Sequence, residues 1–226
     1  MTVLVVTGTD TGVGKTLTTA ALTATLTARG DTVAVYKPVQ AGTENGEGDT
    51  DVIRRLTGCV SVCEGIRLVH PMAPVAAATR SGARLPGLQT HRETIRQLSE
   101  HHDHVLIEGS GGLLVALNED GHTLADLAVT ISAATIVVCR SSLGTLNHTA
   151  LTIEALTRRQ ITIAGLVIGA WPRHPTEVEL GNLNHLSGLT TPLVGTIPEA
   201  AGHLPGNQFR RLAPNWFSTL PTFWRS

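Results

Sequence analysis

The sequence predicts a doubly wound α/β fold, in which helices flank both faces of a mostly parallel sheet. Two observations carry this prediction. Short apolar runs rich in Val and Ile alternate with longer stretches of helical period, as they do in βαβ units. Most of these runs also lack a polar face, which is typical of strands buried between two layers of helices.

Six apolar runs are expected to form strands: Val3–Thr7, Thr32–Tyr36, Val105–Glu108, Thr135–Cys139, Ile163–Ile168 and Leu193–Ile197. The helical period predicts helices at Lys15–Arg29, Thr50–Leu56, Gln89–His101, Leu124–Ser132, Thr145–Arg159 and Glu177–Leu186, and a short one near Phe209. The first helix is rich in Ala, Thr and Leu and follows a Gly-rich turn, and the second follows the polar loop Gly42–Gly48.

No repeat, low-complexity linker or domain boundary is visible, and 226 residues suit one α/β domain. We therefore expect residues 1–226 to form a single domain. Five of the seven aromatic side chains lie in the last eighteen residues: Phe209, Trp216, Phe217, Phe223 and Trp224. Aromatic side chains at this density are expected to leave water. The tail 207–226 should therefore pack on the domain or on a dimer partner rather than stack on a ligand.

The composition excludes several classes of protein. Charged residues make up 15% and hydrophobic residues 42% of the chain, which fits neither a disordered chain nor a membrane protein. The net charge is −1 with no long basic run, so neither nucleic acid nor a membrane surface is an expected partner. Cys59, Cys63 and Cys139 match no disulfide or zinc pattern. Without a leader sequence or a membrane span, the protein is expected to be cytoplasmic.

A strand, a Gly-rich turn and a helix start follow one another near the N-terminus. The turn reads Gly8-Thr-Asp-Thr-Gly-Val-Gly-Lys-Thr16. In this arrangement backbone N–H groups wrap a polyphosphate and the helix dipole favours its charge. Lys15 would reach the β- and γ-phosphates, and the Thr16 hydroxyl would ligate Mg²⁺. The first glycine lies one position early, but Gly-x-Gly-Lys-Thr between a strand and a helix still indicates a fold of the P-loop NTPase type. The residues expected to bind the nucleotide here are Gly12, Val13, Gly14, Lys15, Thr16 and Leu17.

A phosphate loop of this kind also needs an acidic residue for the metal, usually at the end of a neighbouring strand. Glu108 closes an apolar strand and is followed by Gly109, Ser110, Gly111 and Gly112, which let a ligand approach. Asp49 is a second candidate. From its position alone it could equally be the N-cap of the helix that starts at Thr50, and Asp51 is a nearby competitor.

Lysine is rare in this chain, since only Lys15 and Lys37 contribute to the seventeen basic residues. Lys37 closes the apolar strand Thr32–Tyr36, and ligands of doubly wound folds gather at the carboxyl ends of strands. We therefore expect Lys37 to face the same crevice as Lys15. A compact ammonium can follow a phosphoryl oxygen or hold a carboxylate where a planar guanidinium would not fit.

Four motifs together resemble the dethiobiotin synthetase family. They are Gly8-Thr-Asp-Thr-Gly-Val-Gly-Lys-Thr16, Tyr36-Lys-Pro-Val39, Glu108-Gly-Ser-Gly-Gly112 and Gly195-Thr-Ile-Pro-Glu199. They occur in the family's order and span nearly the whole chain. The resemblance implies a homodimeric P-loop ligase of biotin biosynthesis. It would use ATP or another nucleoside triphosphate, Mg²⁺ and CO₂ to close a ureido ring on 7,8-diaminopelargonic acid, through a carbamate and a mixed anhydride with phosphate.

The resemblance also implies roles for individual residues. Thr16, Asp49 and Glu108 would hold the metal, and the catalytic residues would be Lys15, Lys37 and Thr11. Residues that bind the nucleotide would further include Gly109, Ser110, Gly111, Gly169, Ala170, Ile197, Pro198 and Glu199. The substrate would contact Lys37, Ala41, Gly111, Leu143, Gly144, Thr145, Leu146 and Asn147. The last five lie in a strand-to-helix turn that would reach the substrate carboxylate across the dimer, with Pro71–Ala77 lining the substrate slot.

Alternatives remain at several positions. Ser141, Ser142 or Thr145 could merely cap the helix that begins there. The family commonly has Ser or Thr where this chain has Ala41, and often has an adenine-reading Asn where it has Gly169 and Ala170, so the preferred base stays open. The main rival function is a nucleotide-switch ATPase of the partitioning or division-site type, and a second rival is an amidating ligase of the cobyrinate type. Such ATPases carry an additional lysine near the start of the phosphate loop, where this chain has Asp10 and Thr11.

Overall fold

The computed structural model describes residues 1–44, 46–59 and 61–218, and within these residues seven strands form one parallel sheet. The strands, in chain order, are β1 (Thr2–Gly8), β2 (Val33–Ala41), β3 (Val62–Leu68), β4 (His104–Gly112), β5 (Ala134–Cys139), β6 (Ile163–Trp171) and β7 (Leu193–Pro198). Their spatial order is β3-β2-β4-β1-β5-β6-β7. This confirms the predicted doubly wound sheet, with β1 at its centre.

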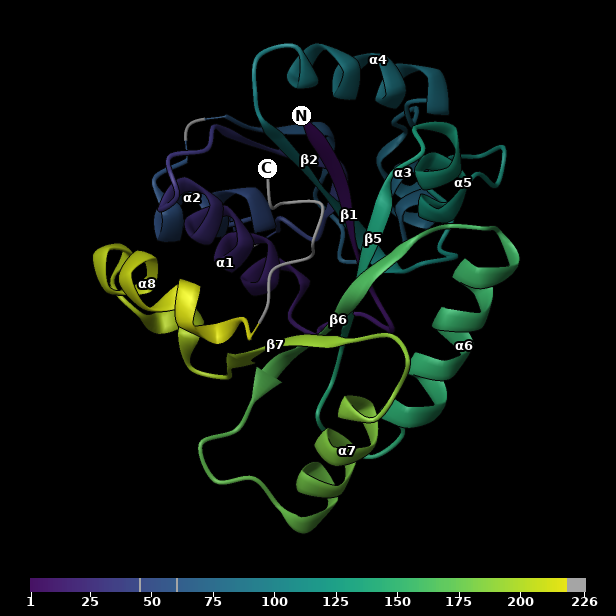
Figure 1. Cartoon of the computed structure of the whole chain (residues 1–226). Coiled ribbons are helices and arrows are strands. Elements are labelled where there is room, and N and C mark those ends of the chain that lie inside the picture. The colour runs from purple at the N-terminus through teal and green to yellow at the C-terminus, as the bar shows by residue number, and fades with distance from the viewer. Residues whose placement is uncertain (45, 60, 219–226) are drawn as a thin grey trace.

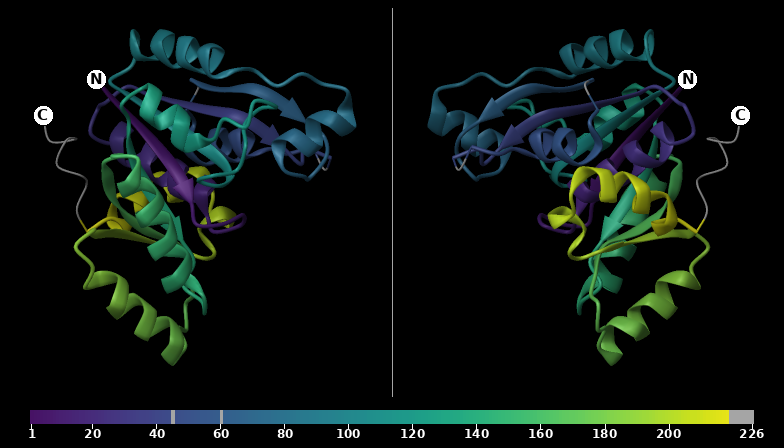
Figure 2. Two further views of the ribbon diagram at one scale, coloured as in Figure 1. Left: turned by 90° about the vertical axis from the view of Figure 1, so that its right-hand side faces the viewer. Right: turned by 90° about the vertical axis from the view of Figure 1, so that its left-hand side faces the viewer.

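Helices cover both faces of the sheet, as Figures 1 and 2 show. One layer contains α1 (Lys15–Thr27), α2 (Asp49–Thr57), α8 (Gly206–Leu212) and the short η1 (Ala201–His203) and η2 (Ala213–Trp216). The other contains α3 (Pro74–Ser81), α4 (Leu88–Ser99), α5 (Leu124–Thr130), α6 (Thr145–Arg158) and α7 (Glu177–Ser187). In the described part of the chain, no helix is long and apolar enough to span a membrane.

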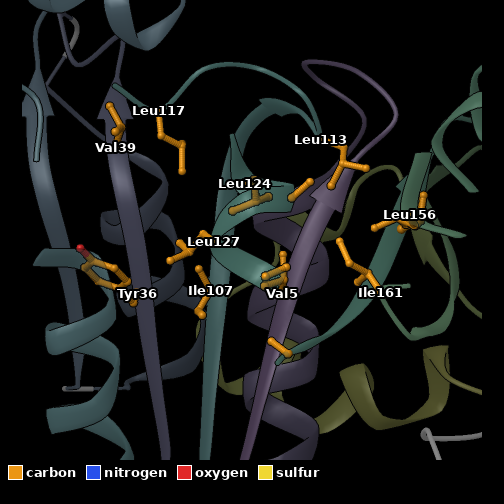
Figure 3. Packing of buried hydrophobic residues seen from close by; sticks show 14 of the residues in the cluster. Val5, Tyr36, Val39, Ile107, Leu113, Leu117, Leu124, Leu127, Leu156 and Ile161 are labelled. Atoms are coloured by element: carbon orange, nitrogen blue, oxygen red, sulfur yellow. The ribbon is translucent and has the colours of Figure 1, made fainter. Parts of the chain in front are cut away.

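The central strands are apolar throughout because each of their faces lies against a helical layer. Val5 of β1 and Ile107 of β4 point toward α5, where they pack near Leu124 and Leu127 (Figure 3). Their sequence neighbours, such as Leu4, belong to the opposite core cluster, beneath α1. This packing fixes the carboxyl ends of β1 and β4 side by side, and both candidate phosphate-site segments start there.

Three expected strands end several residues later than predicted, and one strand and one α-helix were missed. The strand expected at Ile163–Ile168 runs on to Trp171. The strand expected at Thr32–Tyr36 runs on to Ala41, so Lys37 lies inside a strand rather than closing one. The β2–β4 pairing ends at Tyr36, and the missing N–H of Pro38 therefore costs no ladder hydrogen bond with β4. Likewise β4 continues to Gly112. The missed elements are the edge strand β3 and helix α3, which begins at Pro74 inside the expected loop Pro71–Ala77.

The C-terminal segment packs on the rest of the chain as far as the structure describes it. Phe209 is fully buried, and its ring meets that of Trp216 edge-on with centroids 5.1 Å apart. Phe217 pairs with Gly195 of β7. Phe223 and Trp224 lie outside the described residues. The extent of the predicted domain, 1–226, and the packing of the whole tail 207–226 stay predictions.

Candidate active site

The phosphate loop joins the end of β1 to the start of α1. Gly12 and Gly14 have φ angles of +72° and +96°, in the left-handed region that glycine adopts without strain. Gly14 is the N-cap of α1, and no side chain caps the first turn. A helix start that lacks a side-chain cap and lies behind a Gly-rich turn offers its backbone N–H groups to an anion.

The end of β6 packs directly against the phosphate loop. A Cβ atom added to Gly169 would lie 2.1 Å from the carbonyl oxygen of Val13 and 3.0 Å from Cα of Gly14. No side chain fits in this contact, so glycine at position 169 is required by backbone packing. The residue expected to lie near the nucleotide base therefore also supports the loop that would bind the phosphates.

Two carboxylates and one hydroxyl meet beside the loop. Thr16, in the first turn of α1, has its Oγ1 atom 2.8 Å from Oδ1 of Asp49 and 3.0 Å from Oε1 of Glu108. Glu108 lies on β4 and is fully buried, and its second oxygen, Oε2, has no hydrogen-bond partner among the residues that the structure describes. A buried carboxylate oxygen without a partner is costly, and a hard cation such as Mg²⁺ would satisfy it.

The capping alternative for Asp49 was wrong. Helix α2 begins at Asp49 and its N-cap is Gly48. The side chain of Asp51 performs the capping role, since it accepts a 2.9 Å hydrogen bond from the Gly48 N–H. The Asp49 carboxylate instead turns toward Thr16 and Lys37.

Lys37 is buried between the two carboxylates. Its Nζ atom donates to Oε1 of Glu108 at 2.8 Å, to Asp49, and to the carbonyl oxygen of Gly109 at 3.2 Å. Burial lowers the pKa of Lys37, but the charges of Glu108 and Asp49 outweigh it and hold the pKa above its usual value. Burial raises the pKa of Glu108, and Lys37 offsets only part of this rise. For Asp49 the contact with Lys37 outweighs burial, and the pKa is lowered.

Lys15 faces the same crevice, as expected. Its Nζ atom donates a 3.0 Å hydrogen bond to the carbonyl oxygen of Asp10. Burial and the nearby charge of Lys37 lower the pKa of Lys15 to about 8. The Lys15 ammonium and the N–H groups at the start of α1 make this end of the crevice attractive to a polyanion, and binding of such an anion would favour the charged form of Lys15.

A cavity of about 680 Å³ opens at this edge of the sheet. The predicted residues that line it are Thr11, Gly12, Gly14, Lys15, Thr16, Leu17, Lys37, Ala41, Asp49, Glu108, Ser110 and Gly111, together with Pro71–Pro74 of the expected substrate slot. Gln40 lines it too and was not predicted. Its Oε1 atom accepts a 2.8 Å hydrogen bond from the Asp49 N–H, which fixes the start of α2. Only its place in the Tyr36-Lys-Pro-Val-Gln run could have suggested it.

The other predicted site residues do not line this cavity. Val13 is buried in the core, and Gly109 contributes only its carbonyl to Lys37. The expected base-binding residues Gly169, Ala170, Ile197, Pro198 and Glu199 lie at the ends of β6 and β7, with Ile197 buried and Pro198 and Glu199 exposed.

The turn Leu143–Asn147 also lies outside the cavity of its own chain. Helix α6 begins at Thr145 with Gly144 as N-cap and without a side-chain cap, so the capping alternative for Ser141, Ser142 and Thr145 was wrong. Ser141 instead donates from Oγ to Oε1 of Glu179 at 2.9 Å. Leu143 is 82% exposed at the tip of the turn.

Comparisons with known proteins place the chain in a family. Residues 2–203 match a family model described as an AAA domain. The ATP-dependent dethiobiotin synthetase of Mycobacterium avium (strain 104) is 48% identical over 96% of both chains. That of Parafrankia sp. (strain EAN1pec) is 47% identical over 94% of this chain and 90% of its own length.

Solved structures of lower identity share the fold. The MinC:MinD cell division protein complex of Aquifex aeolicus superposes with a TM-score of 0.57 at 17% identity, over 98% of this chain and 88% of that one. Cobyrinic acid a,c-diamide synthase of Mycobacterium smegmatis, with bound ADP and magnesium, gives 0.57 at 19% identity, over 94% and 93%. At these identities the likeness establishes the fold alone, so it does not favour the switch-ATPase alternative. The full-length relatives do decide the family: the chain belongs to the ATP-dependent dethiobiotin synthetases.

Proposed function

We propose that this protein is an ATP-dependent dethiobiotin synthetase, a ligase that forms C–N bonds in biotin biosynthesis. It joins 7,8-diaminopelargonic acid and CO₂ into the ureido ring of dethiobiotin and cleaves a nucleoside triphosphate to the diphosphate and phosphate in the process. The observation that carries the proposal is the position of Lys37. Its buried ammonium lies beside the phosphate loop and between the carboxylates of Asp49 and Glu108, where an anionic reactant and a metal-bound triphosphate would meet.

The nucleotide would lie along the phosphate loop. The backbone of Gly12–Leu17 would hold the phosphates, and Lys15 would leave the Asp10 carbonyl to contact the β- and γ-phosphates. The loop Gly109–Gly111 would border the triphosphate. The base would lie over Gly169–Ala170 and Ile197–Glu199, where backbone groups would accept more than one base.

Thr16, Asp49 and Glu108 would hold Mg²⁺. Oxygen donors from one or two carboxylates and a hydroxyl, completed by phosphate oxygens and water, suit this ion. The unpartnered Oε2 of Glu108 supports this assignment. Within the described ranges no three His, Cys, Asp or Glu side chains gather as a metal site, so the protein offers fewer ligands than a dedicated cage. Bound there, the ion would neutralise charge on the triphosphate.

The residues around the cavity would then position three reactants. One substrate amine takes up CO₂ and loses a proton to give a carbamate, whose oxygen attacks the γ-phosphoryl group and releases the nucleoside diphosphate. The second amine attacks the carbamate carbon, and phosphate leaves as the ring closes. Lys37 would hold the carbamate and phosphoryl oxygens, while Lys15 and Thr11 stabilise the transferring group. A carbamate is already anionic, so the chemistry asks mainly for charge stabilisation and alignment.

The substrate chain would lie beside Ala41 and Gly111, with Pro71–Pro74 on its other side. Its carboxylate would bind at the start of α6, at Leu143–Asn147, contributed by the partner of a homodimer. Two features support this part of the proposal. The turn lies outside its own chain's cavity, and within the described residues no side chain caps the first turn of α6, so its backbone N–H groups are available to an anion. The protein would act in the cytoplasm on small molecules, without nucleic acid or membrane.

The direct test is incubation with 7,8-diaminopelargonic acid, bicarbonate, Mg²⁺ and each nucleoside triphosphate in turn, with dethiobiotin detected by mass spectrometry. We expect product with at least one nucleotide, and none when Mg²⁺ is chelated. Lys37→Ala should abolish product but still bind the nucleotide, because the phosphate loop is intact. Absence of dethiobiotin with every nucleotide, from a protein that hydrolyses them, would favour the switch ATPase instead.

A further inference from the structure

Asp10 and Arg140 lie opposite one another where two neighbouring strands end. β1 and β5 pair in parallel up to Gly8 and Val138, and the Thr9 N–H extends the ladder by donating to the Val138 carbonyl at 2.9 Å. Beyond these residues the segments that follow β1 and β5 leave the sheet. The Arg140 guanidinium donates to Oδ2 of Asp10 across this gap. The phosphate loop is thus tied by an ion pair to the turn that precedes α6.

All three oxygen atoms of Asp10 accept a hydrogen bond, each from a different donor. Oδ2 accepts from Arg140, and Oδ1 accepts from the Thr11 N–H at 2.7 Å. The backbone oxygen accepts from Nζ of Lys15 at 3.0 Å. Asp10 therefore holds the backbone of Thr11 through its side chain, and it holds the Lys15 ammonium through its carbonyl until a phosphate takes over that contact. The proposed function gives both of these loop residues roles in phosphoryl transfer.

Arg140 belongs to a segment that hydrogen bonds hold against α7. The next residue, Ser141, donates from Oγ to Glu179 at 2.9 Å, and its carbonyl oxygen accepts from Nδ2 of Asn182 at 2.8 Å. Both partners belong to α7. Thr11 and Gly12, by contrast, are exposed at the rim of the cavity. The ion pair thus connects an exposed turn of the phosphate loop to a segment that is hydrogen-bonded to α7.

We propose that Arg140 is a positioning residue of the phosphate loop: through its ion pair with Asp10 it holds the first turn of the loop in the geometry that receives a triphosphate. This inference rests on the proposed function for the roles of Thr11 and Lys15. Arg140 does not line the cavity, so it acts through Asp10. The same pair links the phosphate loop to the turn before α6, and it thereby joins the nucleotide site to the segment proposed to bind the substrate carboxylate.

The side chains of Arg140 and Asp10 are 35% and 49% exposed, so solvent screens the pair. Half-exposed ion pairs have small effects, and we expect about a threefold loss of affinity when this one is removed. The loss should appear in the KM for the nucleotide with kcat nearly unchanged, because the reacting groups themselves remain. It should also shrink at 1 M salt, where charges are screened over about 3 Å.

The test is calorimetric titration of the full chain with Mg²⁺ and inorganic tripolyphosphate, a probe that avoids the open question of the base. Four proteins are compared: wild type, Arg140→Ala, Asp10→Asn and the double variant. Asn keeps an oxygen for the Thr11 N–H but loses the charge. Each single variant should bind about threefold more weakly, and the double variant no more weakly than either. Arg96→Ala, which removes two exposed ion pairs near the end of α4, is the matched control and should bind like wild type.

Two results would overturn the inference. One is that the single variants bind tripolyphosphate with wild-type affinity. The other is that the two losses of affinity multiply in the double variant, because independent effects would mean that the residues do not act through each other. Either result leaves the proposed function standing if wild type binds tripolyphosphate and makes dethiobiotin. A wild type that binds tripolyphosphate but makes no dethiobiotin would contradict the proposed function and not the phosphate-loop contact. Unfolding midpoints close to wild type in all variants exclude a general loss of structure.

Discussion

Replacing Lys37 by Met would remove the cation that lies between two carboxylates. Met keeps much of the length of the side chain but donates no hydrogen bond and carries no charge. Glu108 would then be a buried carboxylate facing Asp49, with its Oε2 atom already unpartnered. We therefore expect the variant to fold into a less stable protein, quite apart from any loss of activity.

The size of the loss follows from burial. The side chains of Lys37 and Glu108 are 3% and 1% exposed, and removing one partner of a buried ion pair costs about 3–5 kcal/mol. Asp49 is 35% exposed, so water screens its charge and its contact adds little. Burial already raises the pKa of Glu108, and protonation of Glu108 would limit the damage. The lower value, about 3 kcal/mol, is the better expectation at pH 7.5.

Urea unfolding followed by circular dichroism, in chelator and without nucleotide, measures this loss. Lys37→Met should unfold at lower urea than wild type with a similar slope. The double variant Lys37→Met/Glu108→Gln should recover most of the stability, because the unpaired charge is gone. Mg²⁺ should stabilise the single variant more than wild type, since a bound cation replaces the missing charge. If the single variant is as stable as wild type, or the double variant no better than the single, the charge balance described for this site is wrong.

Three further predictions concern single positions. Gly169→Ala should weaken binding of Mg²⁺ and tripolyphosphate about tenfold, because its Cβ would lie 2.1 Å from the Val13 carbonyl oxygen. The control is Gly181→Ala in α7, where an added Cβ has no described neighbour within 4 Å. This variant should bind normally and gain about 0.5–1 kcal/mol of stability. Asp49→Asn should weaken Mg²⁺-dependent nucleotide binding in a calorimetric titration. Asp51→Asn should leave that titration unchanged and should preserve the cap of α2, because Asn keeps an oxygen for the Gly48 N–H. Burial lowers the pKa of His91 from 6.5 to about 4, so the folded protein keeps it neutral while the unfolded chain binds a proton. The contribution of His91 to the free energy of unfolding should therefore be fully present above pH 6.5 and should fall by about 3 kcal/mol toward pH 4. The His91→Gln variant should lack this pH dependence in urea unfolding.

Each of these expectations has a contrary result. Equal tripolyphosphate binding by both alanine variants would mean that the contact of β6 with the phosphate loop does not matter for binding. A metal titration altered by Asp51→Asn and not by Asp49→Asn would exchange the roles assigned to the two residues. Identical acid profiles for wild type and His91→Gln would show that His91 is not the group that titrates.

The parts of the fold that could be predicted are those in which burial on both faces leaves a plain apolar run. The strands at the centre of the sheet are of this kind. Strand β3 lies at the edge and carries Glu64 and Arg67, which form an ion pair with each other at 2.7 Å. Its mixture of polar and apolar residues resembles a loop when only the sequence is considered.

The candidate site was predictable where its chemistry requires rare residue types. Lys15, Lys37 and Glu108 stand out because lysine is scarce and because a carboxylate directly follows an apolar run. The choice between Asp49 and Asp51 could not be made from spacing, since it depends on which carboxylate the first turn of α2 directs toward the crevice. The requirement for glycine at position 169 is equally invisible in sequence, because it comes from backbone contact between β6 and the phosphate loop.

The most direct test of the central claim follows one oxygen atom. If the carbamate attacks the γ-phosphoryl group in this cavity, an oxygen of bicarbonate passes to the phosphate that is released. A single-turnover reaction with ¹⁸O-labelled bicarbonate, 7,8-diaminopelargonic acid, Mg²⁺ and an accepted nucleotide should yield phosphate with one labelled oxygen for each dethiobiotin formed. Phosphate free of label would mean that water attacks the nucleotide, and would contradict the proposed path of ring closure.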